Sequence, residues 1–402
     1  MPMKPDEMTQ MLALTTRKGV GSVRWQKPAW IDLLPPCNHA CPAGEDIQAW
    51  LALAQAGRDE DAWRKLVENN PLRATHGRAC YHPCESSCNR AALDAPIAIH
   101  AVERWLGDLA SAEGWTVPVA AASGKRVLVV GAGPAGLSCA WHLARRGHAV
   151  EIRDQNPNPG GMMAYGIPEY RLPRAGLAQE IARITALPGV TLRCGERVAD
   201  VAQARRDGGF DAAFVAVGAQ LGNHFDIPAV DGRHFVDAVS VLEQVRRDEH
   251  PALGRVVVVV GGGNVAMDAA RTARRLGADE AVLVYRRDAA HLGAHPQEAA
   301  EAFAEGVKIK WVSTVQQFGA GGVVIEKMAL GADGSVTPTG ETERLAADSV
   351  LLAVGEHADL SLLSATPGAA IVQGVVEVGA DMMTGEAGVL AGGDSIRRAR
   401  PA

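Results

Sequence analysis

The sequence predicts an α/β fold in which two similar units of strand, glycine-rich turn and helix follow an α-helical segment. Glycine-rich turns begin at residues 131 and 261, and each directly follows a run of β-branched residues. A helical pattern of small and apolar side chains comes after each turn. Residues 45–110 instead carry the 3.6-residue periodicity of helices. Together these observations indicate a helical domain followed by two related α/β units.

The first unit has the pattern of a Rossmann-like dinucleotide site. A strand is expected at residues 125–130, before the turn. Glycine suits this turn because it tolerates positive φ and lets the backbone approach a pyrophosphate at the helix N-terminus. Asp154 ends the next strand, where an acidic residue binds a ribose hydroxyl. The expected turn contacts are Gly131, Gly133, Pro134, Ala135 and Gly136.

The second unit repeats the pattern but ends its second strand differently. The expected turn contacts are Gly261, Gly262, Gly263, Asn264 and Val265. The following strand ends in Tyr285, Arg286 and Arg287 with no acidic residue. Arginines at this place favour the 2′-phosphate of NADP. Asp288 follows at once, so the residues alone leave the choice between NAD and NADP open. Two such turns indicate that the chain holds two dinucleotides.

Whole-chain properties narrow the class of protein. The 402 residues carry a net charge of −6 with 21% charged residues, so neither a nucleic-acid footprint nor a membrane-binding surface is expected. No apolar run approaches the roughly 20 residues of a membrane span. Seven cysteines, five of them clustered, do not resemble a secreted disulfide scaffold. We therefore expect a soluble, cytoplasmic protein of two to three domains.

A faint internal repeat supports two related domains. The apolar strands before Gly218 and Gly355 resemble each other, and each follows an aspartate, Asp211 or Asp348. Residues 323–344 alternate like β-strands around a Gly-Ala-Asp-Gly turn, which predicts a small sheet in the second domain.

Five cysteines precede the first α/β unit. Their spacing is Cys37-x3-Cys41 and Cys80-x3-Cys84-x3-Cys88. Thiolates are the usual ligands of iron–sulfur clusters, so several in one small helical unit favour a [4Fe-4S] cluster. A zinc site or an empty site stays open from the residues alone. Cys139 and Cys194 are interpreted as core residues.

Several segments together resemble one flavoprotein group. They are residues 131–136, 160–169, 171–174, 261–268, 285–287 and 392–394. The set is similar to the small (β) subunit of NADPH-dependent glutamate synthase and to the N-terminal region of dihydropyrimidine dehydrogenase, over nearly the whole chain. The resemblance implies two Rossmann-like domains, with the NAD(P)-binding one inserted into the FAD-binding one, after an α-helical cysteine-containing domain. The implied boundaries are 1–120 for the helical domain, 121–230 with 345–402 for the FAD domain, and 231–344 for the NAD(P) domain.

The resemblance also implies a role for each site residue. The first turn would hold the FAD pyrophosphate and Asp154 the adenosine ribose. The second turn would hold the pyrophosphate of NAD(P)H, and Arg286 and Arg287 its 2′ side. The other implied cofactor-binding residues are Gly161, Met162 and Arg171 near the flavin, Gly393 and Asp394 near its ribityl and phosphate part, Gly355 beside the nicotinamide dinucleotide, and Gly218, its counterpart in the repeat. Ordinary core packing for Met162 and Met163, and a solvated surface charge for Arg287, stay open.

One departure from the family concerns the last wall of the flavin pocket. Family members continue after the Gly-Asp pair with glycine or proline and a helix that faces the flavin, whereas residues 395–400 here lead to the chain end. We expect this wall to be altered, with Arg397, Arg398 or a partner subunit in its place.

For the cysteines, the resemblance implies one cluster at most. Relatives carry two clusters and more cysteines. By their pattern Cys41, Cys80, Cys84 and Glu103 would bind the cluster nearer the flavin, while Cys37 and Cys88 would remain from a second one. Cys88 in place of Glu103 is the alternative.

The expected function is that of an FAD-containing NAD(P)H oxidoreductase subunit. Neither α/β unit contains the close cysteine pair of a disulfide reductase, so the flavin needs another electron partner. Hydride chemistry belongs to flavin and nicotinamide, and no side chain is expected to act as a catalytic base. The expected partner is a larger catalytic redox subunit or a ferredoxin-like protein in a hetero-oligomer, with electrons flowing in either direction. The alternatives are a free-standing NAD(P)H:ferredoxin or diaphorase-type reductase and a non-enzymatic FAD-binding docking subunit.

Overall fold

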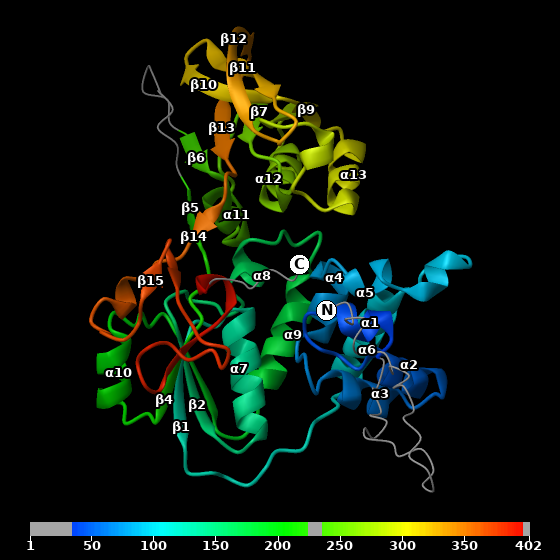
Figure 1. Cartoon of the computed structure of the whole chain (residues 1–402), viewed down its shortest axis with the longest axis vertical. Coiled ribbons are helices and arrows are strands. Elements are labelled where there is room, and N and C mark those ends of the chain that lie inside the picture. Colours follow the sequence, from blue (N-terminus) through cyan, green and yellow to red (C-terminus); the bar gives the residue numbers. More distant parts are fainter. Residues whose placement is uncertain (1–33, 224–234, 397–402) are drawn as a thin grey trace, which may run out of the picture.

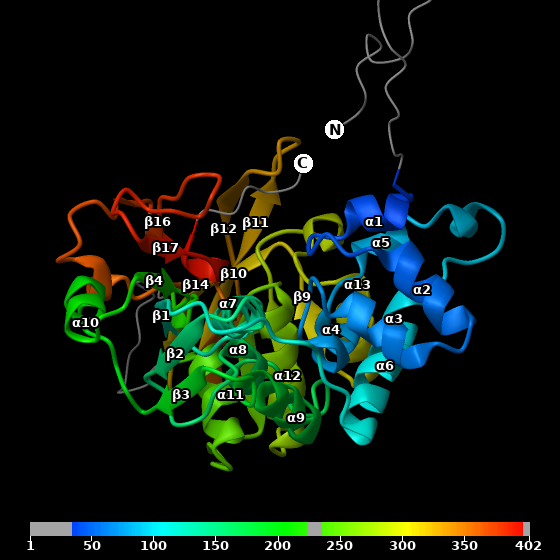
Figure 2. The ribbon, with the colours of Figure 1, turned by 90° about the horizontal axis from the view of Figure 1, so that it is seen from below.

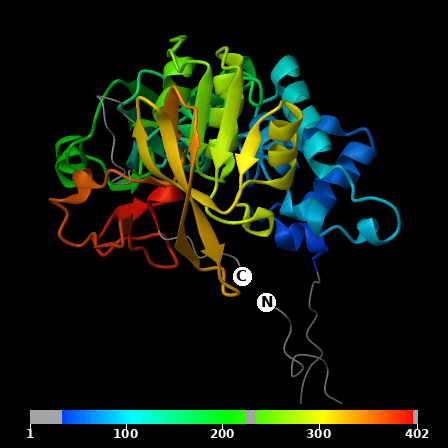
Figure 3. The ribbon, with the colours of Figure 1, turned by 90° about the horizontal axis from the view of Figure 1, so that it is seen from above.

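Three packed parts make up the chain (Figure 1). The computed structural model describes residues 34–223 and 235–396. All three views place the helical segment on one side of the molecule and the residues after β14 (Glu356–His357) on the opposite side (Figures 1, 2 and 3). No helix in the described ranges combines the length and apolar character needed to cross a membrane.

The N-terminal part consists of short helices around a tryptophan-containing core. Its helices are α1 (Pro36–Ala40), α2 (Ile47–Gln55), α3 (Asp59–Leu66), α4 (Arg73–Ala79), α5 (Pro83–Ser86), η2 (Asn89–Ala92) and α6 (Ile99–Glu113). Trp50 and Trp63 are fully buried in this core. Helices α4 and α6 lie very close together at Gly107. A Cβ atom on this residue would lie only 2.4 Å from the backbone nitrogen of Ala74, so no larger residue fits. Glycine therefore permits the packing that places α4.

The first sheet is parallel and has the order β17-β4-β1-β2-β3. Its strands are β1 (Arg126–Val130), β2 (Ala149–Asp154), β3 (Val190–Cys194), β4 (Ala212–Val215) and β17 (Val389–Ala391). The associated helices are α7 (Pro134–Arg145), α8 (Met162–Tyr165), α9 (Arg174–Thr185) and α10 (Val201–Asp207). The strand β17 comes from the end of the described chain and completes the sheet that begins at β1.

A second parallel sheet lies between β4 and β17 in the chain, with the order β6-β13-β7-β8-β9. Its strands are β6 (Phe235–Asp237), β7 (Val256–Val260), β8 (Glu280–Val284), β9 (Lys308–Lys310) and β13 (Ser349–Leu352). The helices are α11 (Ala238–Arg246), α12 (Asn264–Arg275), η3 (Ala289–His291) and α13 (Pro296–Ala304). This order confirms the predicted fold class, in which one Rossmann-like domain interrupts the other.

Smaller sheets complete the two domains. The antiparallel strands β10 (Ser313–Gly319), β11 (Gly322–Leu330) and β12 (Val336–Leu345) confirm the small sheet predicted near residues 323–344. Where the chain passes between the two domains, β5 (Leu221–Gly222) pairs with β14. The remaining elements are η4 (Ser361–Leu363), β15 (Ile371–Val372), β16 (Val375–Val376) and η5 (Gly393–Ser395).

The helical part and the first dinucleotide domain share one hydrophobic core. Trp63 and Leu106 from the first belong to the same buried cluster as Trp141 and Ile181 from the second. The indole of Trp141 donates to the Val67 carbonyl at 3.1 Å. The interface is therefore a continuous core that holds the two parts in one arrangement.

A carboxylate crosses this interface and caps α4. Glu180 of α9 is fully buried and accepts the backbone N–H groups of Ala74 and Thr75 at 2.7 and 2.8 Å. These donors lie in the first turn of α4, where N–H groups have no partner within the helix. A negative charge there also suits the helix dipole. Glu180 thus fixes the N-terminus of α4 against the first dinucleotide domain.

Replacing Glu180 with Gln tests this cap. The amide substitutes a donor for one acceptor oxygen, so one buried N–H loses its charge-assisted bond. We expect unfolding stability to fall by about 2–3 kcal/mol, measured by chemical denaturation. The matched control is Glu68→Gln, since Glu68 is exposed and pairs with Lys65 at 2.8 Å; its cost should stay within about 0.5 kcal/mol. Equal losses of unfolding free energy in both variants would show that the buried cap stabilises the protein no more than a surface ion pair does.

Candidate functional site

The first glycine turn forms a tight cradle at the N-terminus of α7. Gly131 has a φ of 109°, and a Cβ there would lie 2.3 Å from the Ala216 carbonyl oxygen. A Cβ on Gly136 would lie 1.9 Å from the Gly131 carbonyl oxygen. Pro134 begins the helix at a position where a missing N–H costs no helical bond. The turn therefore requires its glycines and leaves the helix N-terminus available to an anion.

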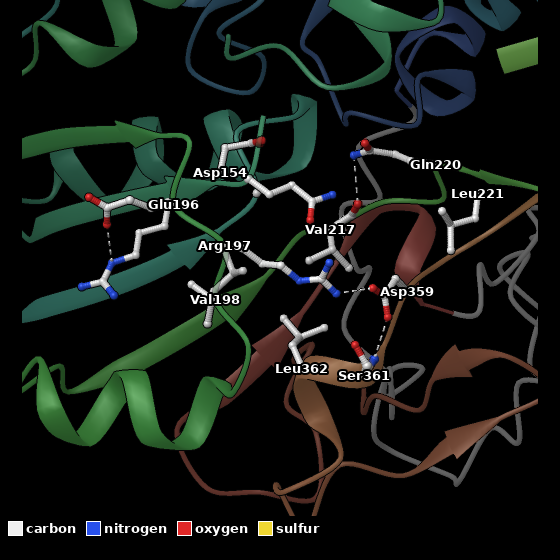
Figure 4. Close-up of a pocket in the computed structure, with 14 residues that line it drawn as sticks. Asp154, Glu196, Arg197, Val198, Val217, Gln220, Leu221, Asp359, Ser361 and Leu362 are labelled. Carbon is white, nitrogen blue, oxygen red and sulfur yellow. Dashed lines mark hydrogen bonds and ion pairs between the residues drawn. The ribbon is translucent and has the colours of Figure 1, made fainter. Parts of the chain in front are cut away.

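Asp154 anchors this turn to the end of β2. Its carboxylate is buried and accepts the backbone N–H groups of Ala132 at 2.7 Å and Asn156 at 2.8 Å. It also lines a cavity of about 140 Å³ together with Gly131 (Figure 4). The predicted ribose contact thus lies beside the turn, at the carboxyl ends of parallel strands where such folds bind ligands.

The same cavity contains side chains that the sequence interpretation missed. Arg197 donates to Asp359 at 2.7 Å across it, and Gln220 donates to the Val217 carbonyl at 3.2 Å (Figure 4). These residues follow the ends of strands β3 and β4, or come from the chain after β14. Their place after strand ends is a signal that could have identified Arg197 and Gln220.

The predicted flavin-side residues gather around the first turn. A Cβ on Gly161 would lie 2.7 Å from the Cα of Gly133, so the two segments are in contact. A Cβ on Gly393 would lie 2.9 Å from the Cβ of Ala135. Met162 and Asp394 line one cavity of about 580 Å³, whereas Met163 is buried in the core. Arg397 and Arg398 lie outside the described residues.

The second glycine turn has the same construction. Gly261 has a φ of 147°, and a Cβ there would lie 2.2 Å from the Ala353 carbonyl oxygen. A Cβ on Gly262 would meet the Tyr285 ring at 2.4 Å. Gly263, Asn264, Val265 and Gly355 line the cavity that also contains Met162 and Asp394, and Gly218 precedes Ala219 in its wall. Residues of both predicted dinucleotide sites therefore open on one cavity between the domains.

Arg171 bridges the two dinucleotide domains in the wall of that cavity. Its guanidinium pairs with Asp268 of α12 at 2.5 Å and with Glu298 of α13. Burial raises the pKa of Asp268 to about 7, although Arg171 acts in the opposite direction. Burial likewise raises the pKa of Glu298. The expected flavin-side position of Arg171 is compatible with the shared cavity, but its ion pairs were not predicted.

The end of β8 differs from the end of β2 as the sequence indicated. Arg286 is exposed, and Arg287 is half-buried, with an Nε atom that has no hydrogen-bond partner among the described residues. Asp288 accepts the backbone N–H of His291 at 3.2 Å and pairs with its ring at 2.6 Å. The nearby carboxylate is thus engaged with its own turn, which leaves the arginines as the charges available to a ligand.

The cysteines separate into two groups. Cys41, Cys80 and Cys84 line a cavity of about 460 Å³ that also includes Glu103, Pro134 and Met162. Cys37 and Cys88 are not among the residues around it. Burial, together with the neighbouring Cys80 and Cys41, raises the pKa of Cys84 to about 12. Three thiols therefore face the space next to the first glycine turn.

Glu103, which lines this cavity, also forms an ion pair. Its carboxylate accepts from Arg73 at 2.8 Å, and the fully buried Arg73 also pairs with Glu45 at 2.6 Å. Burial raises the pKa of Glu103 to about 7, while Arg73 opposes this effect. The Arg73–Glu103 pair links α4 to α6, and the Arg73–Glu45 pair links α4 to the segment before α2.

The thiols at this cavity have the chemistry of cluster ligands. Cys41, Cys80 and Cys84 are the soft ligands that iron–sulfur clusters use. Within the described ranges, no three Cys, His, Asp or Glu side chains converge closely enough to hold one metal ion. The residues therefore fit three ligands of a cluster, with Glu103 or Cys88 as candidates for the fourth.

Comparisons with known proteins agree with this geometry. Residues 125–402 match the family model described as pyridine nucleotide-disulphide oxidoreductase. Residues 33–115 match the model described as dihydropyrimidine dehydrogenase domain II, 4Fe-4S cluster. Among solved structures, Mycobacterium tuberculosis FprA in complex with NADPH gives a TM-score of 0.56 at 19% identity, covering 68% of this chain and 79% of that chain. The likeness to FprA, at this low sequence identity, shows a similar fold only.

Curated relatives include subunits of larger enzymes. The chain is 37% identical over 412 residues to the NADP(+)-dependent formate dehydrogenase subunit beta of Moorella thermoacetica, covering 91% of this chain and 57% of that protein. It is 32% identical over 333 residues to the NAD-dependent dihydropyrimidine dehydrogenase subunit PreT of Escherichia coli (strain K12), covering 81% and 77%. The chain spans about half the length of the first curated relatives it matches.

The ion pairs of Arg171 generate a prediction about domain docking. Arg171→Ala leaves Asp268 and Glu298 buried without their shared counter-charge, so we expect a loss of about 3–5 kcal/mol in unfolding stability. Hydrogen exchange should also increase in α12. Arg247→Ala is the matched control, because Arg247 pairs with Glu243 on the surface of α11 and should cost about 0.5 kcal/mol or less. An Arg171 variant no less stable than this control would contradict the role.

Proposed function

Because the chain belongs to the pyridine nucleotide-disulphide oxidoreductase family, we propose that it is an FAD-containing NAD(P)H oxidoreductase subunit that exchanges electrons with a partner redox protein. The family match agrees with the resemblance predicted from the motifs. One observation carries the proposal: the flavin-side residues Met162 and Asp394 line the same cavity between the two Rossmann-like domains as the second glycine turn. This arrangement suits hydride exchange between two bound dinucleotides.

The chain's own side chains bind and orient the cofactors. We assign the FAD pyrophosphate to the turn at residues 131–136, the ribose to Asp154, and the flavin side to Gly161, Met162 and Asp394. The second turn is assigned to NAD(P)H. When bound, the flavin supplies a hydride acceptor that can also exchange single electrons. Arg171 links the two domains in the wall of this cavity through its ion pairs with Asp268 and Glu298.

The electron partner is not a disulfide of this chain. All seven cysteines are unpaired, and the two in the first dinucleotide domain, Cys139 and Cys194, lie on different elements, α7 and β3. The thiol cavity instead adjoins Pro134 and Met162 of the flavin side. We assign Cys41, Cys80 and Cys84 to one [4Fe-4S] cluster, whose chemistry when bound is the transfer of single electrons. The family match at residues 33–115 supports this assignment.

A larger catalytic redox subunit is the proposed partner, in a hetero-oligomer. The names of the relatives support it, since they describe subunits of a formate dehydrogenase and of a dihydropyrimidine dehydrogenase. The unpaired cysteines favour a reducing, cytoplasmic location. We propose domain boundaries at residues 1–120, at 121–230 with 345–402, and at 231–344.

Anaerobic stopped-flow absorbance tests the proposal. Mixing the FAD-loaded protein with NADPH or NADH should bleach the flavin band within the time of a turnover. The absence of bleaching with both would refute the oxidoreductase function. Iron and acid-labile sulfide, measured on the same anaerobic preparation, test the cluster separately, because values near zero would remove the cluster and leave the flavin chemistry intact.

Dinucleotide preference gives a second prediction. Arg286→Ala removes an exposed cation at the proposed 2′-phosphate site, so NADPH should bind about 10- to 100-fold more weakly while NADH changes little. Flavin-bleaching titrations with both dinucleotides measure the ratio. The control is Arg255→Ala, an exposed arginine that pairs with Asp279 before the start of β7. Equal losses for NADPH and NADH would exclude the 2′-phosphate contact.

A further inference from the structure

Tyr81 lies where the three parts of the protein meet. It comes from the helical part, and its hydroxyl accepts a hydrogen bond from the side-chain amide of Asn264 in the second glycine turn. Its ring stacks on His295, with centroids 5.1 Å apart and an interplanar angle of 14°. Tyr81 also lines the cavity between the dinucleotide domains with Met162 and Gly263. A residue of the helical part thus forms part of the proposed NAD(P)H site.

Asn264 is held in one orientation by these contacts. Its Oδ1 accepts the backbone N–H of His295 at 2.8 Å, and its Nδ2 donates to Tyr81. An amide nitrogen carries two hydrogens, so one donor stays available after the bond to Tyr81. Asn264 is the first residue of α12, where the positive end of the helix dipole favours an anion. The oriented amide is therefore well placed to donate to a pyrophosphate.

Tyr81 also belongs to the segment that carries the thiols. It directly follows Cys80 and precedes His82, and the segment ends at Cys84. His82 has a φ of 50°, and its backbone N–H donates to the Cys80 sulfur at 3.3 Å. Both the thiol cavity and the cavity between the domains include Tyr81 and Met162 in their walls. Tyr81 therefore connects the second glycine turn to the backbone between two of the three thiols.

We propose that Tyr81 is a positioning residue that orients Asn264 for the pyrophosphate of NAD(P)H and thereby couples dinucleotide binding to the thiol segment at residues 80–84. The inference rests on the proposed function in one respect, which is that the second glycine turn binds NAD(P). Because coupling between two sites is reciprocal, occupation of either site changes the affinity or the mobility of the other. The helical part is then a sensor of the dinucleotide as well as a carrier of thiols.

Calorimetric titration of the oxidised protein with NADP⁺ and NAD⁺ tests the positioning without turnover. Tyr81→Phe keeps the ring stacking and removes the hydroxyl, so the tighter of the two dinucleotides should bind about three- to tenfold more weakly. Tyr81→Ala should lose more. Tyr165→Phe is the matched control, since its hydroxyl bonds to the backbone of Asn158 in the first domain. Unchanged affinity in both Tyr81 variants would overturn the proposal.

Hydrogen exchange supplies a readout that a purely structural tyrosine would not change. In the wild type, the bound dinucleotide should slow exchange in peptides covering residues 80–88, and Tyr81→Ala should abolish this protection. Exchange in α10 should stay the same in all cases. Protection that persists in Tyr81→Ala would refute the coupling. If the wild type binds neither dinucleotide, the proposed function itself fails, whereas normal wild-type binding with unaffected Tyr81 variants refutes this inference alone.

Discussion

The buried cap formed by Glu180 is the interaction on which the arrangement of the sites depends. Burial raises the pKa of Glu180, and the N–H groups of Ala74 and Thr75 offset this cost by donating to the carboxylate. The cap holds one end of α4, and the other end leads directly into Cys80 and Tyr81. The carboxylate therefore fixes, against the first dinucleotide domain, the start of the helix that leads to the thiol segment. Without it, α4 would be held to that domain mainly by non-directional apolar contacts.

Steric exclusion by glycine gives the two dinucleotide domains the same construction. The first glycine of each turn touches a carbonyl oxygen just beyond a neighbouring strand, Ala216 after β4 for Gly131 and Ala353 after β13 for Gly261. This contact explains the internal repeat, because the strands before Gly218 and Gly355 occupy equivalent places in their sheets. The two glycine-turn sites differ in the residues at the end of the second strand. Asp154 stands at one such end and the two arginines stand at the other.

Local patterns explain why the fold and much of the site could be predicted. A glycine turn between a strand and a helix fixes its own geometry within a few residues, so Gly131, Asp154 and Gly261 could be assigned from spacing alone. The contacts of Arg171 with Asp268 and Glu298 could not, because they join elements about 100 residues apart and depend on domain docking. The contacts of Tyr81 could not be predicted for the same reason. Its neighbours in sequence are thiols, and its partners in space belong to another domain.

The shared cavity walls determine the order of the assigned sites. Met162, Ile167 and Tyr81 border both the cavity between the dinucleotide domains and the thiol cavity. The second glycine turn opens only on the first of these cavities, whereas Pro134 of the first turn opens on the thiol cavity. The flavin-side residues Met162 and Ile167 therefore border both the cavity that the second turn lines and the thiol cavity. Under the proposed function, the flavin side would stand between the nicotinamide dinucleotide and the thiols in either direction of electron flow. The packing of α4, α8 and α12 sets this order of the assigned sites.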